Sequence, residues 1–379
     1  YLYQCELCCE CIDCVRCRSL SYSQDCDNCS DSMFLVHCVG CRDCFGCVGL
    51  KNKQYHIFNR PYEKDEYVSK VRELLQDIPM AKLQYEAFKR MQPHCATDSI
   101  ACEDCSGDHL INCKDCHDVF ILKDSEQSAY CAYCEGNKSC MDSNFSNIGE
   151  LQFHSTNLVK NYHVMFANLA WYNTNSIYIT SCFNSSNLFG CIAMKKHSHC
   201  ILNKQYTKEQ YEELVPRIIS HMRKTGEWGE YYPQKYSPFC YNESVAGMEY
   251  PLDRATVLRH GWKWHEEEIL SDRYLGPNLD IPNSIHDVKD SIMKKILLCE
   301  VTGKPYKIIP QELKFYREMG IPIPRRCPDR RHKDRMALRN PRKLWNRQCA
   351  KCNITIETTY APDRPEIVYC QKCYLSTVY

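Results

Sequence analysis

The sequence lacks the features that assign many chains to a functional class at once. No run of about 18 apolar residues occurs, so we expect no membrane span, and no secretory signal peptide is visible. No nucleophile with its base, no carboxylate pair suited to a pocket and no glycine-rich phosphate-binding loop can be recognised. These absences predict a non-enzymatic protein of the cytoplasm with no membrane partner.

Net charge is also small. The 379 residues carry 48 Lys and Arg against 47 Asp and Glu, which gives +1 at pH 7. The balance conceals an asymmetry, because residues 1–50 hold seven acidic side chains against three Lys or Arg, whereas the last 80 residues are strongly basic. We therefore expect the two ends of the chain to have different roles.

Cysteine, in contrast, is abundant. The 30 cysteines make up about 8% of the chain, a share usual only in short secreted scaffolds. A chain of this length can bury a hydrophobic core without a disulfide framework. Metal binding, or the use of cysteine as a small core residue, accounts for both the length and the count.

The cysteines of the first 50 residues recur at a fixed interval. Cys14, Cys26 and Cys38 are twelve residues apart, and a second series with the same step begins at Cys5. This period is too short for a helical repeat and fits one coil of a narrow β-solenoid, in which residue i lies about 4.8 Å from residue i+12. The coil length resembles that of insect antifreeze β-helices, without their Thr-x-Thr face, so the resemblance concerns architecture alone.

A second cysteine-rich stretch runs over residues 94–206. Its pairs Cys102-x-x-Cys105 and Cys113-x-x-Cys116 are eleven residues apart, and further on asparagines take the place of cysteines. Asparagine tolerates left-handed turns and can form hydrogen bonds along a stack. We expect a second solenoid here, with wider coils.

An internal duplication links the two stretches at an offset of 144 residues. The segment "FGCVGLKNKQYHIFNRPYEKDEYVSKV" from Phe45 matches "FGCIAMKKHSHCILNKQYTKEQYEELV" from Phe189. Each copy is predicted to end in an amphipathic helix, at about residues 62–77 and 207–223, that closes the solenoid. Pro79 is expected to end the first helix and Pro216 to kink or restart the second.

These patterns predict a mainly β fold with two cysteine-rich β-solenoid segments, each closed by an amphipathic helix, and C-terminal zinc-ribbon modules. The expected divisions are a first solenoid over 1–60, a capping helix and linker over 61–93, a second solenoid over 94–206, a helix and connector over 207–298, a degenerate ribbon-like module over 299–335 and a zinc ribbon over 336–379.

The most specific motif lies near the C-terminus. Cys349-Ala-Lys-Cys352 and Cys370-Gln-Lys-Cys373 are separated by seventeen residues, which is the spacing of a structural zinc site with four thiolate ligands. The intervening residues alternate like a hairpin. We therefore expect zinc as the cofactor at these four cysteines, with redox use as the alternative.

The segment just upstream, "CEVTGKPYKIIPQELKFYREMGIPIPRRCPDRRHKDR", resembles the probable zinc-ribbon family, whose pattern is C-x-x-C-G-K, then Gln-Glu-x-x-Phe-Tyr, then Pro-x-R-C-P-x-C-R. The resemblance implies four zinc-binding cysteines, but here Thr302 and Arg330 replace two of them, leaving Cys299 and Cys327. Because two thiolates rarely suffice for zinc, we expect a module held by packing. The whole chain also resembles uncharacterised cysteine-rich zinc-ribbon proteins of uncultured bacteria, which implies an architecture and no activity.

The cysteine pairs of the solenoid leave three alternatives open. Stacked pairs can form a second tetrathiolate zinc site, they can pack as reduced thiols in a narrow interior, or they can form disulfides. The candidate zinc ligands of the first alternative are Cys14, Cys17, Cys26 and Cys29. Cys113-Lys-Asp-Cys116-His117 matches a haem-attachment pattern, but it belongs to the same series of pairs.

An arginine-rich segment, residues 325–347, is the feature that most suggests a partner. Arginine favours forked contacts with phosphates, and a nearby tryptophan can stack on an unpaired base. The candidate nucleic-acid-binding residues are Arg325, Arg326, Arg330, Arg331, Arg335, Arg339, Arg342, Lys343, Trp345 and Arg347. The alternative is that the segment docks within the chain on the acidic N-terminal coils.

Together these features predict a non-enzymatic zinc-binding protein that contacts RNA or a ribonucleoprotein. A structural or metal-holding assembly protein, with copies joined through the solenoid ends as a homo-oligomer, is the first alternative. An exported, disulfide-rich surface protein is the second.

Overall fold

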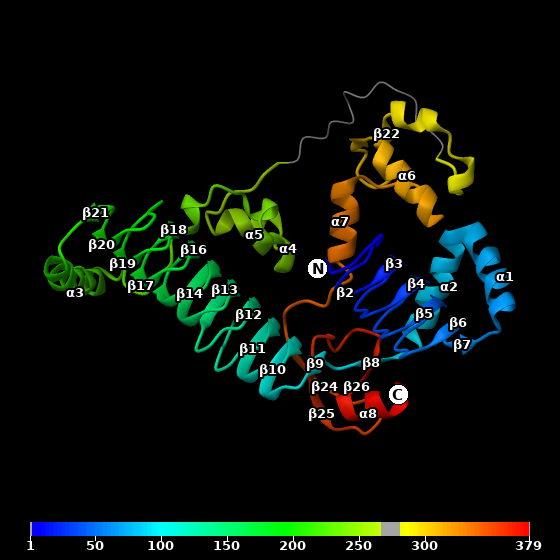
Figure 1. The fold of residues 1–379 in the computed structure, drawn as a ribbon, viewed down its shortest axis with the longest axis horizontal. Coiled ribbons are helices and arrows are strands. Elements are labelled where there is room, and N and C mark those ends of the chain that lie inside the picture. Colours follow the sequence, from blue (N-terminus) through cyan, green and yellow to red (C-terminus); the bar gives the residue numbers. More distant parts are fainter. Residues whose placement is uncertain (1, 267–280, 379) are drawn as a thin grey trace.

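The computed structural model describes residues 2–266 and 281–378 (Figure 1). The structure is mixed α/β and rich in strands, with large and mostly parallel sheets. We call residues 2–61 the first ladder and residues 99–205 the second ladder. No helix in the described part of the chain is both long and apolar enough to cross a membrane.

The first ladder confirms the twelve-residue step. Arg18 pairs with Ser30, Ser30 with Arg42 and Arg42 with Gln54, all in parallel. Its strands are β1 (Leu2–Tyr3), β2 (Cys14–Val15), β3 (Arg18–Ser21), β4 (Ser30–Met33), β5 (Arg42–Phe45), β6 (Gln54–Ile57) and β7 (Arg60–Pro61). Isolated parallel bridges with the same step, such as Val15 with Asp27, fill the positions between them.

A regular backbone pattern produces this step. Every third residue from Gln4 to Phe58 has a positive φ, so the chain turns four times in each twelve residues. Most of these positions are not glycine, although a side chain in this conformation is disfavoured. From Cys11 to Cys47 the position that follows each turn is buried, which places most of the cysteines and a few Leu and Ser in the interior of the ladder.

Buried thiols in the first ladder bond to the backbone beside them. The Cys14 Sγ donates to the Ile12 carbonyl at 3.2 Å, and the Cys26 Sγ donates to the Gln24 carbonyl at 3.2 Å. All thirty cysteines lie in the described residues, and every one is a free thiol. Burial raises the pKa of Cys26 and Cys38 well above the usual thiol value. A protonated thiol is the form that packs in this way, as a small core residue.

The second ladder begins with an eleven-residue step and then continues with twelve. Glu103 pairs with Lys114, and after a register shift Gly107 pairs with Val119. Gly107 has a φ of 143°, and a Cβ there would lie 1.8 Å from the Val119 carbonyl oxygen, so only glycine fits. The strands are β9 (Ser99–Ile100), β10 (Glu103–Ile111), β11 (Lys114–Lys123), β12 (Ala132–Glu135), β13 (Met141–Asn147), β14 (Glu150–Val159), β15 (Tyr162–Met165), β16 (Asn168–Trp171), β17 (Thr174–Ile177), β18 (Thr180–Phe183), β19 (Ser186–Phe189), β20 (Ser198–Ile201) and β21 (Lys204–Gln205).

The expectation of wider coils in the asparagine-rich part is wrong. Tyr162 pairs with Thr174 and Thr174 with Ser186, so the step remains twelve residues. The buried Asn161 accepts from the Asn173 backbone N–H at 2.7 Å and donates to the Ala170 carbonyl at 2.6 Å. An asparagine side chain thus fills a cysteine position and bonds the neighbouring backbone, so no extra space is needed.

The duplicated segments have matching structures. β6 and β7 form an antiparallel turn at the end of the first ladder, and β20 and β21 do so 144 residues later. In each turn an asparagine clamps the backbone below it: Asn59 bonds the N–H and carbonyl of Val48, and Asn203 bonds those of Ile192. The duplication therefore extends to individual hydrogen bonds.

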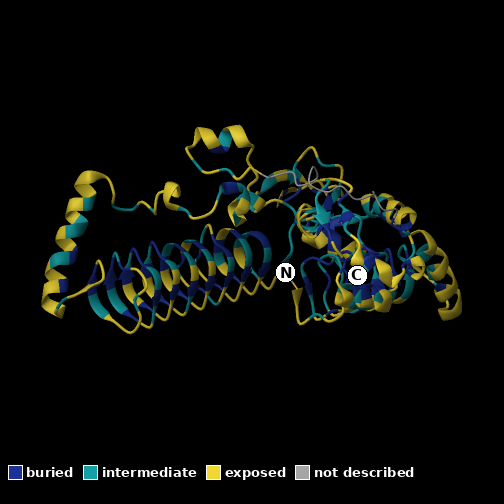
Figure 2. Ribbon diagram, turned by 90° about the horizontal axis from the view of Figure 1, so that it is seen from above, coloured by how far each residue is buried: buried dark blue, intermediate teal, exposed yellow. Residues whose placement is uncertain are grey.

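Helices follow each turn, but the first differs from the expectation. α1 (Lys64–Leu74) leads through a short 3₁₀ helix (Leu75–Asp77) into α2 (Ile78–Arg90), because Pro79 sits in the first turn of α2, where proline is tolerated. α1 and α2 pack on aromatic side chains of the first ladder. α3 (Lys208–Thr225) continues through Pro216 without interruption and stands across the far end of the second ladder (Figure 2).

A connector and a small helical module follow. The connector contains 3₁₀ helices at Gln234–Tyr236 and Tyr241–Glu243, α4 (Val245–Glu249) and α5 (Arg254–Arg259). The module has 3₁₀ helices at Ile285–Asp287 and Asp290–Lys294, strands β22 (Leu297–Leu298) and β23 (Pro305–Tyr306), α6 (Pro310–Met319) and α7 (Pro328–Met336). Its apolar core extends to Cys9, Tyr22 and Met33 of the first ladder.

The last residues form the four-cysteine module, residues 345–378. It comprises β24 (Trp345–Gln348), β25 (Thr355–Thr358), β26 (Ile367–Tyr369) and α8 (Gln371–Val378). β24 and β25 are antiparallel, whereas β26 pairs in parallel with β8 (Pro93–Cys95), the strand between the two ladders. The expected hairpin between the two cysteine pairs is therefore wrong, since the second half of that segment joins a strand more than 270 residues away. Figure 1 shows this module at the junction of the ladders.

Candidate metal centre

The four C-terminal cysteines come from two local structures. Cys349 and Cys352 lie in the turn that joins β24 to β25, where Asn353 adopts a φ of 60° and donates its backbone N–H to the Cys349 carbonyl. Cys370 directly follows β26, and Cys373 lies in the first turn of α8. The second cysteine pair therefore lies at the start of a helix. In a zinc ribbon it would lie in a second turn between strands.

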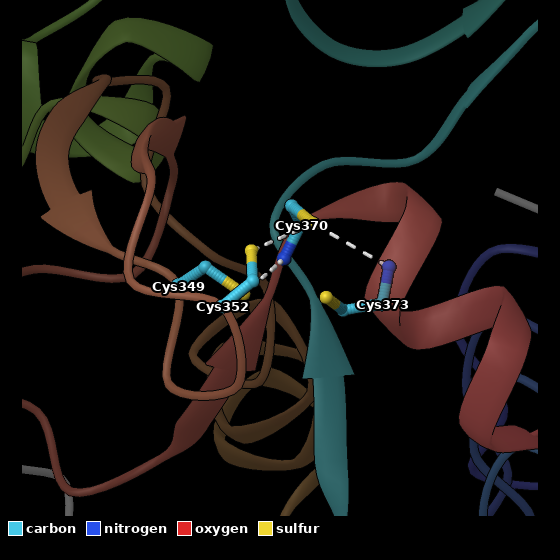
Figure 3. A group of neighbouring side chains, drawn as sticks. All are labelled: Cys349, Cys352, Cys370 and Cys373. Carbon is cyan, nitrogen blue, oxygen red and sulfur yellow. Dashed lines mark hydrogen bonds between the residues drawn. The ribbon is translucent and has the colours of Figure 1, made fainter.

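The geometry of these thiols suits a metal ion. The sulfurs of Cys349, Cys352, Cys370 and Cys373 all lie within 4.8 Å of one another (Figure 3). The Cys352 and Cys370 sulfurs are 3.8 Å apart, which equals the separation of two ligands on a tetrahedral zinc with bonds of about 2.3 Å. The cluster can hold a metal ion such as zinc, as the sequence spacing predicted.

Backbone N–H groups support the thiolate form of the cluster. The Cys370 N–H donates to the Cys349 Sγ at 3.2 Å, and the Cys373 N–H donates to the Cys370 Sγ at 3.4 Å. Burial opposes ionisation, but backbone N–H groups of Cys370, Cys352 and Lys351 lower the pKa of Cys349 to about 6. Burial and the neighbouring thiols raise the pKa of Cys373 to about 12. A metal ion must therefore displace at least one proton when it binds at neutral pH.

The module is attached to the segment between the ladders. The Ala96 N–H donates to the Tyr369 carbonyl at 2.9 Å, and the Thr358 hydroxyl donates to the Ala96 carbonyl at 2.7 Å. Ala96 also shares an apolar core with Cys349, Cys370 and Cys373. The candidate metal ligands thus belong to the same packed unit as the connection between the ladders.

The weaker candidate zinc site in the first ladder has a different geometry. Within the described residues, no group of at least three ligands with mutual distances below 4.8 Å includes Cys14, Cys17, Cys26 or Cys29. The thiols of Cys14 and Cys17 donate to carbonyls two residues earlier in the chain, both at 3.2 Å. These bonds describe the packed-thiol alternative, and zinc at this position stays a prediction.

In the helical module, no ligand cluster forms around Cys299 and Cys327 among the residues that the structure describes. Both thiols are buried in the apolar core of the module, and the Thr302 hydroxyl lies 3.9 Å from the Cys327 Sγ. Leu313 and Tyr316 of α6 pack on this core, as the sequence predicted for a module held by packing.

Most arginines of the predicted nucleic-acid segment are engaged within the chain. Arg339 forms two bonds with Asp13, at 2.6 and 2.7 Å, and Arg335 binds Glu10 at 2.8 Å. Both acids belong to the first ladder, so the chain contains the intramolecular docking that was the alternative to a nucleic-acid contact.

The other candidates in this segment also have internal partners. Arg330 and Arg326 pair with Asp334, Arg331 with Glu312, and Arg342 with Glu249, while Lys343 lies over the Trp345 ring. Arg325 donates to Ile281 and Asn283, and Arg347 donates to the carbonyls of Ala361 and Glu366.

The structure contains a second ligand cluster that no sequence motif indicated. Asp25 and His37 of the first ladder meet Asp98, Asp108 and His109 at the junction. Asp25 and His37 are twelve residues apart, so the step already recognised for cysteine places them in one column. No comparable pattern indicates that His109 of the second ladder belongs to this cluster, because its position there depends on how the two ladders meet.

Comparison with models of known protein families gave no match, and comparison with curated proteins gave none. The resemblance of residues 299–335 to the probable zinc-ribbon family, and of the chain to cysteine-rich zinc-ribbon proteins, thus stays a prediction.

Proposed function

We propose that this is a non-enzymatic structural protein in which a zinc-binding C-terminal module fixes two β-solenoids against each other. The observation that carries the proposal is the parallel pairing of β26 with β8. β26 ends directly before Cys370, and β8 lies in the chain segment that connects the ladders. Zinc binding and the position of this connection are therefore coupled.

We infer the solenoid architecture from the hydrogen bonding around each step. Between Glu6 and Val15, backbone N–H groups spaced three residues apart each donate to a carbonyl eleven residues further on. Together with a positive φ at every third residue, this pattern supports a narrow coil that closes in twelve residues. A coil this narrow has room for side chains up to about the size of Leu at its buried positions, which fits the thiol-rich core.

Zinc is the metal that the ligand set favours. Four thiolates with tetrahedral spacing are typical of structural zinc, and a site closed by four protein ligands leaves no position for a substrate. Structural zinc contributes directly to the folding free energy of small modules. Besides its cysteines, the module contributes Ile356, Tyr360 and Val368 to the buried core around the site, and we expect its attachment to β8 to depend on the metal as well.

The test replaces one ligand and follows both the metal and the connection. Cys349→Ser should lower the zinc content from one ion per chain to none. Residues 93–99 should then become sensitive to protease, and the radius of gyration from small-angle X-ray scattering should rise as the ladders separate. Cys240→Ser, a matched change in the connector, should alter none of these. A zinc-free Cys349→Ser protein with unchanged scattering and protease resistance would contradict the proposal.

Contact with RNA or a ribonucleoprotein is the weaker candidate. A phosphate contact through Arg335 or Arg339 would have to replace the ion pair that each forms with the first ladder. The carboxylate left behind would then be buried without a positive partner, which is unfavourable. This candidate function would be supported if the purified chain bound RNA with an affinity that falls steeply with salt, and if Arg330→Gln weakened that binding.

Association of copies through the solenoid ends also stays a proposal. An exposed strand edge favours such pairing, but each ladder finishes in a short antiparallel return strand, β7 or β21. Sedimentation of the purified chain over a range of concentrations tests this directly.

A further inference from the structure

A cavity of about 80 Å³ lies at the junction of the two ladders. Its wall includes Asp25 and His37 from the first ladder, Asp98 from the connection, and His109 from β10. Neither ladder alone supplies all four side chains. The proposed zinc module closes another side of the cavity but contributes no cysteine to it.

The four side chains form a closed ring of nitrogen and oxygen atoms. His109 Nε2 lies 3.3 Å from Asp25 Oδ1 and 3.8 Å from Asp98 Oδ2. On the other side, His37 Nε2 lies 3.9 Å from Asp25 Oδ2, and His37 Nδ1 lies 3.5 Å from Asp98 Oδ2. Each imidazole therefore faces both carboxylates.

These separations are long for hydrogen bonds and suitable for metal ligands. Charge-assisted N–H to carboxylate bonds are normally about 2.7–2.9 Å long. Ligands on a tetrahedral ion with bonds of about 2.0–2.2 Å are separated by roughly 3.3–3.6 Å. One ligand atom from each of Asp25, His37 and Asp98 lies within 4.8 Å of the other two, and His109 would complete the set by moving closer to them.

The charges on the cavity wall favour a cation. Three arginines line the cavity, and each already has a carboxylate partner: Arg339 with Asp13, Arg342 with Glu249, and Arg364 with Glu366. Three further carboxylates remain, those of Asp25, Asp98 and Asp108, against Lys89 and the imidazoles. Carboxylates gathered at a partly buried position are costly unless positive charge faces them, and a bound cation would add such charge.

His94 provides an independent observation. It lines the same cavity, only 2% of its surface is exposed, and within the described part of the chain neither ring nitrogen has a hydrogen-bond partner. Its ring centroid lies 6.2 Å from that of His37. A buried imidazole without partners is unfavourable, and a water molecule bound to a metal in the ring would satisfy it.

We propose that Asp25, His37, Asp98 and His109 bind a divalent transition-metal ion that joins the two ladders at their junction. Two imidazoles and two carboxylates are a mixed nitrogen and oxygen set, which suits Mn²⁺, Fe²⁺ and Zn²⁺, whereas the four C-terminal thiolates select zinc. The chain then has two metal sites of different chemistry, and this one goes beyond the proposed role of the four-cysteine module.

Mn²⁺ is the most selective probe, because thiolates bind it weakly. In a titration of the full-length, zinc-loaded chain, the electron paramagnetic resonance signal of free Mn²⁺ should stay suppressed up to one equivalent. Asp25→Asn and Asp98→Asn should each weaken binding by about tenfold or more. The control is Asp43→Asn, which removes a carboxylate of the first ladder that lies outside the cavity and bonds to Gln54.

Circular dichroism checks that each variant has folded. Even if a variant fails to fold, the titration of the wild type shows whether the chain binds Mn²⁺. The site is supported if the wild type and Asp43→Asn suppress the signal of free Mn²⁺ whereas Asp25→Asn and Asp98→Asn do not. Absence of binding by the wild type, or equal binding by all folded variants, overturns it. Neither of these results changes the zinc content of the four-cysteine module, so this proposal and the proposed function fail separately.

Discussion

Breaking the ion pair between Arg339 and Asp13 should open the junction between the ladders. The two Arg339–Asp13 bonds, at 2.6 and 2.7 Å, join side chains that are only 16% and 13% exposed. Arg339 also donates to the Tyr133 hydroxyl of the second ladder at 3.0 Å, so one guanidinium connects both ladders.

The magnitude follows from the burial of the pair. Removing one partner of a buried pair costs about 3–5 kcal/mol, and His109 near Asp13 supplies some compensation, so we expect about 3 kcal/mol for Arg339→Met. At 1.36 kcal/mol per factor of ten, this corresponds to a roughly 100-fold larger population of the open junction. Asp13→Asn in the same chain should recover much of the loss, because no uncompensated charge remains.

Hydrogen exchange of the Ala96 amide measures this opening, since that N–H bonds across the junction to Tyr369. The matched control is Arg16→Met, which removes the Arg16–Asp27 pair on the surface of the first ladder, where the side chains are 54% and 38% exposed. Pairs this exposed are worth less than about 1 kcal/mol. If Arg339→Met and Arg16→Met changed the exchange rate equally, the role given to Arg339 would be refuted.

Three further predictions concern acid, the backbone and the metal. Burial tends to raise the pKa of Asp13, but the ion pair with Arg339 outweighs burial and lowers this pKa below its usual 3.8. The stability that the pair contributes is therefore present above pH 3.8 and is lost as pH falls through the lower pKa of the folded protein. The wild-type junction should show an acid transition below about pH 4 in the same hydrogen-exchange measurement, and Asp13→Asn should lack it. Gly107→Ala places a Cβ against the Val119 carbonyl and should cost about 2 kcal/mol or more in urea denaturation, whereas Gly226→Ala, with open space around it, should cost less. Acidification should release zinc as the thiolates of the four-cysteine module are protonated, and a chromogenic chelator should detect one ion per chain.

The sequence predicted those parts of the fold that repeat or that depend on close spacing. The twelve-residue step of Cys14, Cys26 and Cys38 predicted the strand register, and two C-x-x-C pairs predicted the four-cysteine cluster that can hold a metal ion. In contrast, the pairing of β26 with β8 involves three residues on each side, and no local pattern indicates which distant strand such a short segment will join. The ring of Asp25, His37, Asp98 and His109 was missed for the same reason, since half of it is contributed by each side of the junction.

Expectations from sequence fail at prolines and asparagines whose side chain has more than one role. Pro79 was expected to end a helix, but it occupies the first turn of the next one. Asn161 was expected to widen the coil, but its amide replaces the thiol of a cysteine and bonds the backbone. In both cases the residue type was correctly recognised as special, and its three-dimensional environment decided which property mattered.

The uneven exposure of the thirty thiols has a consequence for oxidative damage. Cys352 is the one exposed cysteine among the thirty, whereas most ladder thiols are buried. A protonated, buried thiol reacts slowly with peroxide, and a thiolate at the surface reacts fast. If a metal bound at the four cysteines were lost, the Cys352 sulfur would face solvent only 3.8 Å from that of Cys370, and an oxidant would join these two cysteines before it reached the ladders. Disassembly under oxidative stress would then begin at the junction and leave both ladders intact.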